Sequence, residues 1–475
     1  MNGQEGTGTA SVFVGKALLR YIIPFRIDLA QEGEGSFGAV CGRLASRSWA
    51  PITEFDPNHH LYDHILSGLR PESGAPYLGR AWSWQDPKAA GSGLRVAFTL
   101  PGDPEDRLLL KNVSLALFTT GVGFLWYDVR RDPSAAQRGP RSLENLLRLH
   151  QQLGNISSYN RRHVQFTDGG EPYQLAVWVR DLLSAFLGPV RFFNSLDMDG
   201  SGPPLRALRF AYAVLEGEDG IPLTTRVCQL ARGFASLSVP GQDLARQSLE
   251  AFQGTCIHIA REGCAYVSSS AAPEFNRKHF LSRFETCYFW IYLLTLQQSY
   301  ALKDFARRIA ESAGADPAER AGSMDRLLAE ISSFLVRNEF AGVSDAHHIN
   351  EFYCYGLSQL NIREESVTLH DSLNALTQLQ NSIRQAREAK REKEADARVE
   401  FGLALLAFLA VISALCDSVG VITGILDEHL RGIWWIPVAL LWLLVAGIVA
   451  LAVRLLRGRD LPRLLRKGRK SGGED

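Results

Sequence analysis

The chain has 475 residues, and its 51 Lys and Arg balance 51 Asp and Glu, so the formal net charge is zero. A net charge of zero gives no reason to expect that the protein binds nucleic acid. The length of the chain leaves room for two or three folded units. The seven cysteines form no Cys-x-x-Cys pair, which indicates reduced thiols rather than disulfides or a zinc site.

The first part of the chain predicts an α/β domain. Residues 1–10 are rich in Gly and Thr, so we expect them to be disordered. They have no apolar signal core, so we expect the C-terminal apolar stretches to direct membrane insertion. Residues 11–272 alternate strand and helix patterns, which predicts a cytosolic α/β domain. Strand, turn and strand follow one another at 115–130 and again at 255–270. One interpretation is therefore an internal duplication, with related subunits at 11–165 and 166–272.

Local signals fix several elements of this domain. The opening stretch 11–30 is extended, and Pro24 favours a place at a sheet edge. Ser142 is a predicted N-cap for a helix that runs to residue 154. Further helices are expected at 172–187 and from residue 222.

Residues 33–40, GEGSFGAV, match the G-x-G-x-x-G-x-V pattern of a protein-kinase glycine loop. A kinase also needs a strand lysine shortly downstream, a catalytic H-R-D-like loop and a D-F-G motif. The next lysine is Lys88, outside any such context. We therefore interpret the stretch as a turn.

Two histidines give a weak metal-site pattern. His60 and His64 in DPNHHLYDH would share one face of a helix at spacing i and i+4. No further ligand is recognisable nearby, and Pro57 favours a helix start. A structural role is the commoner outcome for such a pair.

A second weak metal pattern comprises Asp197, Asp199 and Ser201, which reproduce the start of an EF-hand calcium loop. The twelfth position of such a loop should be a bidentate glutamate, and here it is Leu208. We therefore expect a polar turn that leads into a strand. No nucleophile–base pair or phosphate loop is present, so we do not expect an enzyme or a resident cofactor.

The C-terminal half changes to helical patterns. Residues 273–344 predict a helical region, whose aromatic core CYFWIYLLTL is too short to cross a membrane. Residues 345–400 hold no proline and predict a stalk helix that continues into the next segment. Its apolar residues keep a coiled-coil-like spacing, which predicts a homo-oligomer; they are Ile362, Leu369, Leu373, Leu376 and Ile383.

Two apolar stretches, 401–426 and 432–453, are each long enough to cross a bilayer, which predicts a transmembrane hairpin at 401–456. Basic residues precede the first stretch and fill the tail 457–475. Because basic flanks stay in the cytoplasm, both termini should face inward across the cell membrane, plasma or inner.

A cytosolic α/β domain, a stalk helix, a membrane hairpin and a basic tail in this order resemble the two-transmembrane CorA-like family of metal-ion transporters. The likeness covers about residues 345–470. It implies a homo-pentamer whose first membrane helix lines a pore for a divalent cation. The family's Gly-Met-Asn signature is replaced here by the stretch 420–426, which lacks the asparagine, while Asp427 and Glu428 resemble the acidic outer loop.

The first membrane segment also carries a polar stripe. Ser413, Asp417, Gly420 and Gly424 fall at i, i+4, i+7 and i+11, with Thr423 beside them. A carboxylate in this position should face water or a partner, which favours a pore. A close-packing stripe of small residues is the alternative.

Two functions remain open from the sequence. One is an oligomeric CorA-like cation channel or transporter, gated by its cytosolic domain. The other is a membrane-anchored sensor, scaffold or defence-type effector whose hairpin tethers or perturbs the membrane. The cytosolic ligand or partner of either is not identified by any motif.

Overall fold

The computed structural model describes residues 12–29, 33, 35–45, 48–56, 60–70, 78–85, 95–97, 107–131, 141–156, 165–167, 172–195, 197–217, 220–234, 247–314 and 317–426, with five single residues between 436 and 447. The chain divides into two compact units, Met1–Ala375 and Leu376–Asp475.

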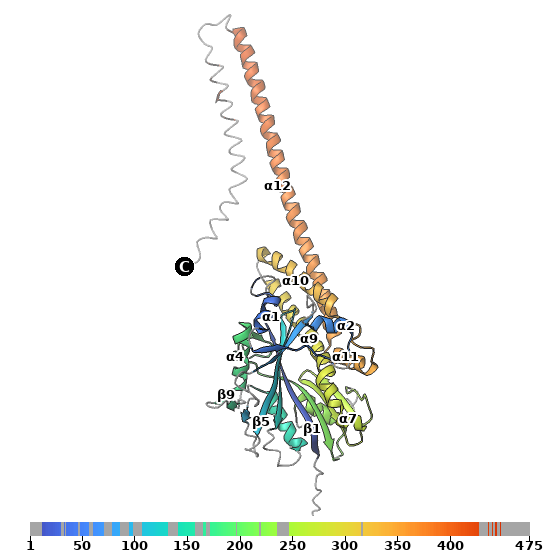
Figure 1. Ribbon diagram of the computed structural model, residues 1–475. Helices are drawn as coiled ribbons and strands as arrows, with labels where there is room; N and C mark the ends of the chain where they lie inside the picture. Colours follow the sequence, from blue (N-terminus) through green and yellow to red (C-terminus); the bar gives the residue numbers. More distant parts are fainter. Residues whose placement is uncertain are drawn as a thin grey trace, which may run out of the picture. The chain divides into compact units, whose positions relative to one another are not determined.

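The first unit is built on a twisted β-sheet (Figure 1). This mixed sheet has the strand order β12-β13-β11-β1-β6-β5-β3-β2. β11 and β13 pair in parallel, whereas the other neighbours in this order pair antiparallel. β7 and β10 add to β1, β4 adds to β5, and β8 pairs with β9 separately. The strands are β1 (Phe13–Arg26), β2 (Trp49–Pro51), β3 (Gly79–Trp84), β4 (Arg95–Ala97), β5 (Arg107–Phe118), β6 (Val122–Arg131), β7 (Arg141–Ser142), β8 (Gln165–Thr167), β9 (Pro172–Gln174), β10 (Arg191–Phe192), β11 (Leu208–Glu216), β12 (Thr255–Ala260) and β13 (Gly263–Ser268).

Strand β1 confirms the predicted extended segment but corrects its place, because it lies inside the sheet between β6 and β11. Pro24 is tolerated there since β1 has no registered partner at this position on the side of β10 and β11. The pairing with β11 ends at Ile22, and that with β10 begins at Phe25. Pro24 has no backbone N–H, but on that side of β1 no neighbouring strand would accept a hydrogen bond from this position.

Helices cover both faces of the sheet, with α1 and α4 on one side and α9 and α11 on the other (Figure 1). The helices are α1 (Phe37–Ala45), α2 (Asp63–Leu69), α3 (Leu143–Gly154), α4 (Leu175–Leu187), α5 (Leu223–Arg232), α7 (Glu274–Lys278), α8 (Phe280–Arg283), the π-helical turn η2 (Phe284–Tyr288), α9 (Phe289–Gly314), α10 (Pro317–Asn338), α11 (His347–Gln359) and α12 (Ile362–Leu426). The mixed α/β sheet domain with many helices is thus confirmed.

Alternation along β1 explains the two layers. Tyr21 and Ile23 pack into one core with α1, α3, α4 and α5, while Leu18 and Ile22 pack into a second core with α2, α9, α10 and α11. Successive side chains of a strand point to opposite faces, so a strand buried on both sides is apolar at nearly every position.

Several local predictions are confirmed. Ser142 Oγ accepts a hydrogen bond from the Asn145 amide at 3.3 Å and caps α3. The glycine motif begins as a turn, with Gly33 at a φ of 81°, but its last four residues, 37–40, belong to α1. The predicted helix 172–187 is shorter, because its first three residues form β9. Strands from both halves of 11–272 join one sheet, so the halves are not separate subunits.

The expected single stalk helix 345–400 is corrected in two respects. It is two helices, α11 and α12, which are separated at Asn361, where φ is +55°. In addition, Leu369 and Leu373 are 4% and 7% exposed and belong to the core of the first unit. Their apolar stripe is therefore covered by the chain itself, which removes them as evidence for a coiled coil between subunits.

The described part of the second unit is the remainder of α12 and five single helical residues. α12 is one uninterrupted α-helix of 65 residues, as the absence of Pro from the sequence of this stretch predicts.

Candidate functional site

The most unusual surface of the described chain is the apolar part of α12. Its segment Gln385–Ala414 is long and apolar enough to cross a membrane, and none of its most apolar stretch is buried. A core helix would be mostly buried and a signal sequence would lie near the N-terminus, and this helix is neither. Large side chains are exposed along it: Phe401, Leu403, Leu405, Leu406, Leu409 and Val411. Such a surface needs a cover of lipid or protein.

No other helix of this kind is found among the described residues. The second predicted span, 432–453, falls almost wholly outside them. Only Ile436, Ala439, Trp442, Leu443 and Gly447 are described there, and each is helical. Among the described residues, α12 is thus the one helix able to cross a membrane, and the hairpin stays a prediction.

The predicted polar stripe lies on this helix. Ser413 and Asp417 are both exposed, and one turn of continuous helix separates them. The backbone of Gly420, Thr423 and Gly424 continues the same helix up to Leu426. The regular helix places positions 413, 417, 420 and 424 along one face. Asp427 and Glu428 lie outside the described residues.

His60 and His64 do not form the predicted helical pair, because α2 begins only at Asp63. The backbone amides of His60 and Leu61 instead donate to Asp56 Oδ2. His64 stacks against Tyr62, with ring centroids 5.6 Å apart. His60 thus lies before the helix, and His64 lies within it.

Asp197, Asp199 and Ser201 form a polar turn before β11. Asp199 Oδ1 accepts hydrogen bonds from the Ser201 amide at 3.0 Å and from the Ser201 hydroxyl at 2.9 Å. These bonds lower the pKa of Asp199. The carboxylate is thereby used to hold the turn, and the described residues contain no group of three His, Cys, Asp or Glu side chains that could hold a metal ion.

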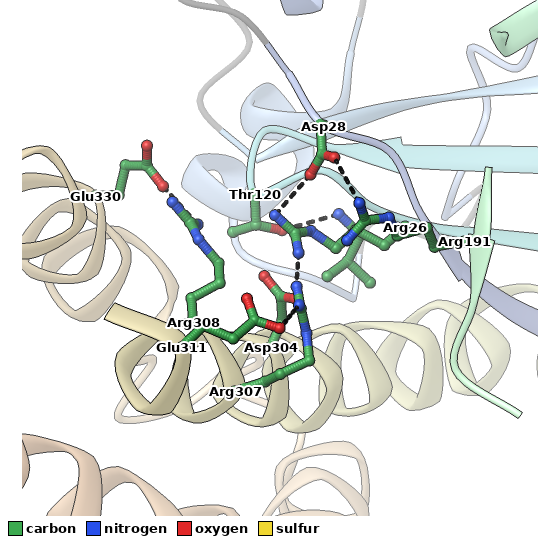
Figure 2. Close-up of polar contacts among 10 residues, drawn as sticks. Arg26, Asp28, Thr120, Arg191, Asp304, Arg307, Arg308, Glu311 and Glu330 are labelled. Atoms are coloured by element: carbon green, nitrogen blue, oxygen red, sulfur yellow. Dashed lines mark hydrogen bonds and ion pairs between the residues drawn. The ribbon is translucent and has the colours of Figure 1, made fainter. Parts of the chain in front are cut away.

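Sequence reasoning missed a network of arginines and carboxylates where β1 meets α9 and α10 (Figure 2). Arg26 pairs with Asp304 at 2.7 Å and with Asp28 at 2.8 Å. Arg307 pairs with Asp304 at 2.9 Å, and Arg308 pairs with Glu330 at 2.6 Å. A cavity of about 500 Å³ lies beside this network. Each of these three arginines already has a carboxylate partner. The network therefore connects β1 to α9 and α9 to α10, and we do not interpret it as a binding site for an anionic ligand.

A second buried ion pair lies inside the sheet. Arg20 on β1 contacts Asp128 on β6 at 2.7 Å, and Asn112 donates to the same carboxylate at 2.8 Å. The Arg20 guanidinium also donates to the carbonyl oxygen of Glu285 and lies 4.3 Å from the centre of the Phe289 ring. The pair therefore connects the sheet to η2 and α9. Alternating strand patterns predict the strands but not which polar residues inside them face each other.

No protein-family model matches the chain, and neither the curated proteins nor the solved structures contain a significant match.

Proposed function

We propose that this chain is an integral membrane protein of CorA-like type, in which copies of α12 come together and pass cations, under the control of the cytosolic α/β unit. The observation that supports this most is Asp417. It is an exposed carboxylate that continues the apolar segment of a 65-residue helix.

Burial in lipid would penalise this carboxylate by about 2.5–3.5 kcal/mol on insertion scales. A water-filled path removes the penalty, and a symmetric assembly would bring several copies of Asp417 into one ring. Such rings attract cations and repel anions. The transported ion would be a divalent cation by the family resemblance, and the hairpin 401–456 would leave both termini in the cytoplasm.

Cation flux into proteoliposomes tests the proposal. We expect wild type to conduct and Asp417→Asn to lose flux or cation selectivity while it keeps its oligomeric mass in mild detergent. Asp396→Asn is the matched control, because it makes the same change at an exposed position of the same helix, before the predicted membrane stretch 401–426. Equal flux through wild type and Asp417→Asn, or no flux through wild type, would contradict the proposal that Asp417 lines a cation pore.

A membrane-anchored sensor or effector is the second candidate, and one observation favours it. Leu369 and Leu373, which the sequence assigned to an intersubunit seam, are buried in the core of their own unit. A monomeric mass in detergent, together with absent flux, would favour this candidate.

A further inference from the structure

A cavity of about 620 Å³ lies where β11 begins, and residues from both helix layers line it. Arg209 comes from β11, Lys303 from α9 and Glu365 from the first turn of α12. Its volume is in the range that binds small molecules, about 300–1,000 Å³. It is distinct from the arginine network of Figure 2 and from the membrane helix.

Arg209 is the unusual member of this lining. The residue is 4% exposed, and its Nε donates to the carbonyl oxygen of His150 at 3.2 Å. Within the described part of the chain, no carboxylate lies within 4 Å of its guanidinium. A buried charge without a partner is strongly unfavourable, so proteins generally pair it. The buried guanidinium therefore lacks an anion in direct contact, and the carboxylate of Glu262 acts on it only from a longer distance.

The groups behind Arg209 cannot supply that negative charge. Burial raises the pKa of Tyr21 well above its ordinary value, so its phenol stays neutral. Burial and the neighbouring Arg209 lower the pKa of His150 well below its ordinary value, so the imidazole stays neutral as well. These two neutral groups bond to each other, with Tyr21 Oη 2.8 Å from His150 Nδ1.

Glycines make the space for this guanidinium. A Cβ at Gly154, the last residue of α3, would lie 2.0 Å from Arg209 Nη2. A Cβ at Gly233, just after α5, would lie 2.3 Å from Arg209 Nε. Two helix ends thus leave out the side chains that would otherwise displace the arginine head group.

The rest of the cavity adds to the positive charge. Its lining includes four cations, Arg206, Arg209, Arg261 and Lys303, against two carboxylates, Glu262 and Glu365. Burial of its ammonium group lowers the pKa of Lys303, and Glu365 opposes that shift. Glu365 Oε2 is itself buried without a hydrogen-bond partner. The surplus of positive charge favours an anionic occupant.

We propose that this cavity binds a small phosphorylated molecule with a planar ring, of the nucleotide class, with the phosphate on Arg209. A guanidinium offers the forked pair of donors that matches phosphate oxygens. Phe193 and Tyr300, whose ring centroids are 4.7 Å apart, supply an aromatic wall in the same cavity. The occupant would touch Leu360 and Glu365, where α11 passes into α12, so binding is placed where it can act on the base of the long helix.

Calorimetric titration of the full chain in detergent tests the site, with adenosine 5′-monophosphate, inorganic phosphate and adenosine as probes at constant ionic strength. We expect the nucleotide to bind saturably, phosphate to bind more weakly and adenosine not to bind. Arg209→Gln should weaken nucleotide binding by about tenfold or more, because a charge-assisted pair of donors is lost. Arg148→Gln is the control, because this exposed arginine on α3 pairs with Glu144 away from the cavity.

Arg261→Gln keeps the test decisive if Arg209→Gln fails to fold, since Arg261 is exposed and lines the cavity. It should weaken nucleotide binding several-fold and leave the melting temperature of the free protein unchanged. Absence of binding by the nucleotide and phosphate, equal binding of adenosine, or unchanged binding in both variants would each overturn the proposal. Binding is measured without an ion gradient, so the result does not depend on whether the protein conducts.

Discussion

Arg20 and Asp128 occupy directly paired positions on β1 and β6 and form two bonds, Nε to Oδ1 at 2.7 Å and Nη2 to Oδ2 at 3.2 Å. Their side chains are 9% and 0% exposed. Water therefore screens the pair little, and the loss of one partner leaves the other charge uncompensated in the sheet.

We expect Asp128→Asn to lower the free energy of unfolding by about 3–5 kcal/mol, because the Arg20 charge stays buried without its carboxylate. Urea denaturation followed by circular dichroism measures this change. Glu144→Gln is the control, since the Glu144–Arg148 pair is exposed and contributes little. Equal midpoints for the two variants would contradict a structural role for the buried pair.

The start of α12 gives a second prediction. Leu369→Asp should destabilise the first unit by about 3 kcal/mol or more, since it places a charge where a leucine fills the core. Val367→Asp, two residues away on a side chain that is 63% exposed, should change stability little. Thermal unfolding at two protein concentrations tells whether Leu369 is buried within its own unit or at an interface between subunits. A loss of stability that vanishes on raising the concentration would instead place Leu369 at a subunit interface.

A third prediction concerns pH and follows from His150. Burial lowers its pKa in the folded state, whereas the unfolded chain takes up a proton below about pH 6.5. The unfolded state then binds more protons, so the stability contributed by this histidine is present above about pH 6.5 and is lost as the pH falls. The slope is at most about 1.4 kcal/mol per pH unit for one such group.

Chemical denaturation between pH 7 and pH 5 measures that slope. We expect His150→Gln to be less stable at pH 7, because it disturbs the bond to Tyr21, yet to lose less stability on acidification. His370→Gln, a change of an exposed histidine, should keep the wild-type slope. Identical slopes for His150→Gln and wild type would show that another group carries the pH dependence.

The sequence predicted what depends on local chemistry and missed what depends on distant partners. The Ser142 cap and the unbroken helix after Ile362 follow from residues within a few positions of each other. The apolar spacing of Leu369 and Leu373 was visible, but spacing alone does not say whether another subunit or the same chain covers it. For the same reason the cavity escaped prediction, because Gly154, Arg209 and Gly233 meet only through the packing of α3, β11 and α5.

The candidate membrane site shows the same division. The regular helix brings Ser413 and Asp417 onto one face, as their spacing predicts. Whether that face meets water, lipid or a second helix depends on partners that the spacing does not encode. In the two weak metal motifs, the carboxylates of Asp56 and Asp199 accept hydrogen bonds from nearby backbone amides, which the spacing of the motifs did not predict.

The last prediction tests the membrane topology that the proposed function requires. In a cysteine-free background, we expect His429→Cys to react with a membrane-impermeant thiol reagent added outside intact cells, and Lys470→Cys to react only after the cells are opened. The basic flanks on both sides of 401–456 motivate this, because lysines and arginines near membrane segments stay in the cytoplasm. If 401–426 crosses alone and 432–453 does not return, both positions should react from outside. Labelling of position 470 but not of position 429 from outside would show that the orientation is the opposite of the predicted one. The cavity around Arg209 would then lie on the outer side of the membrane.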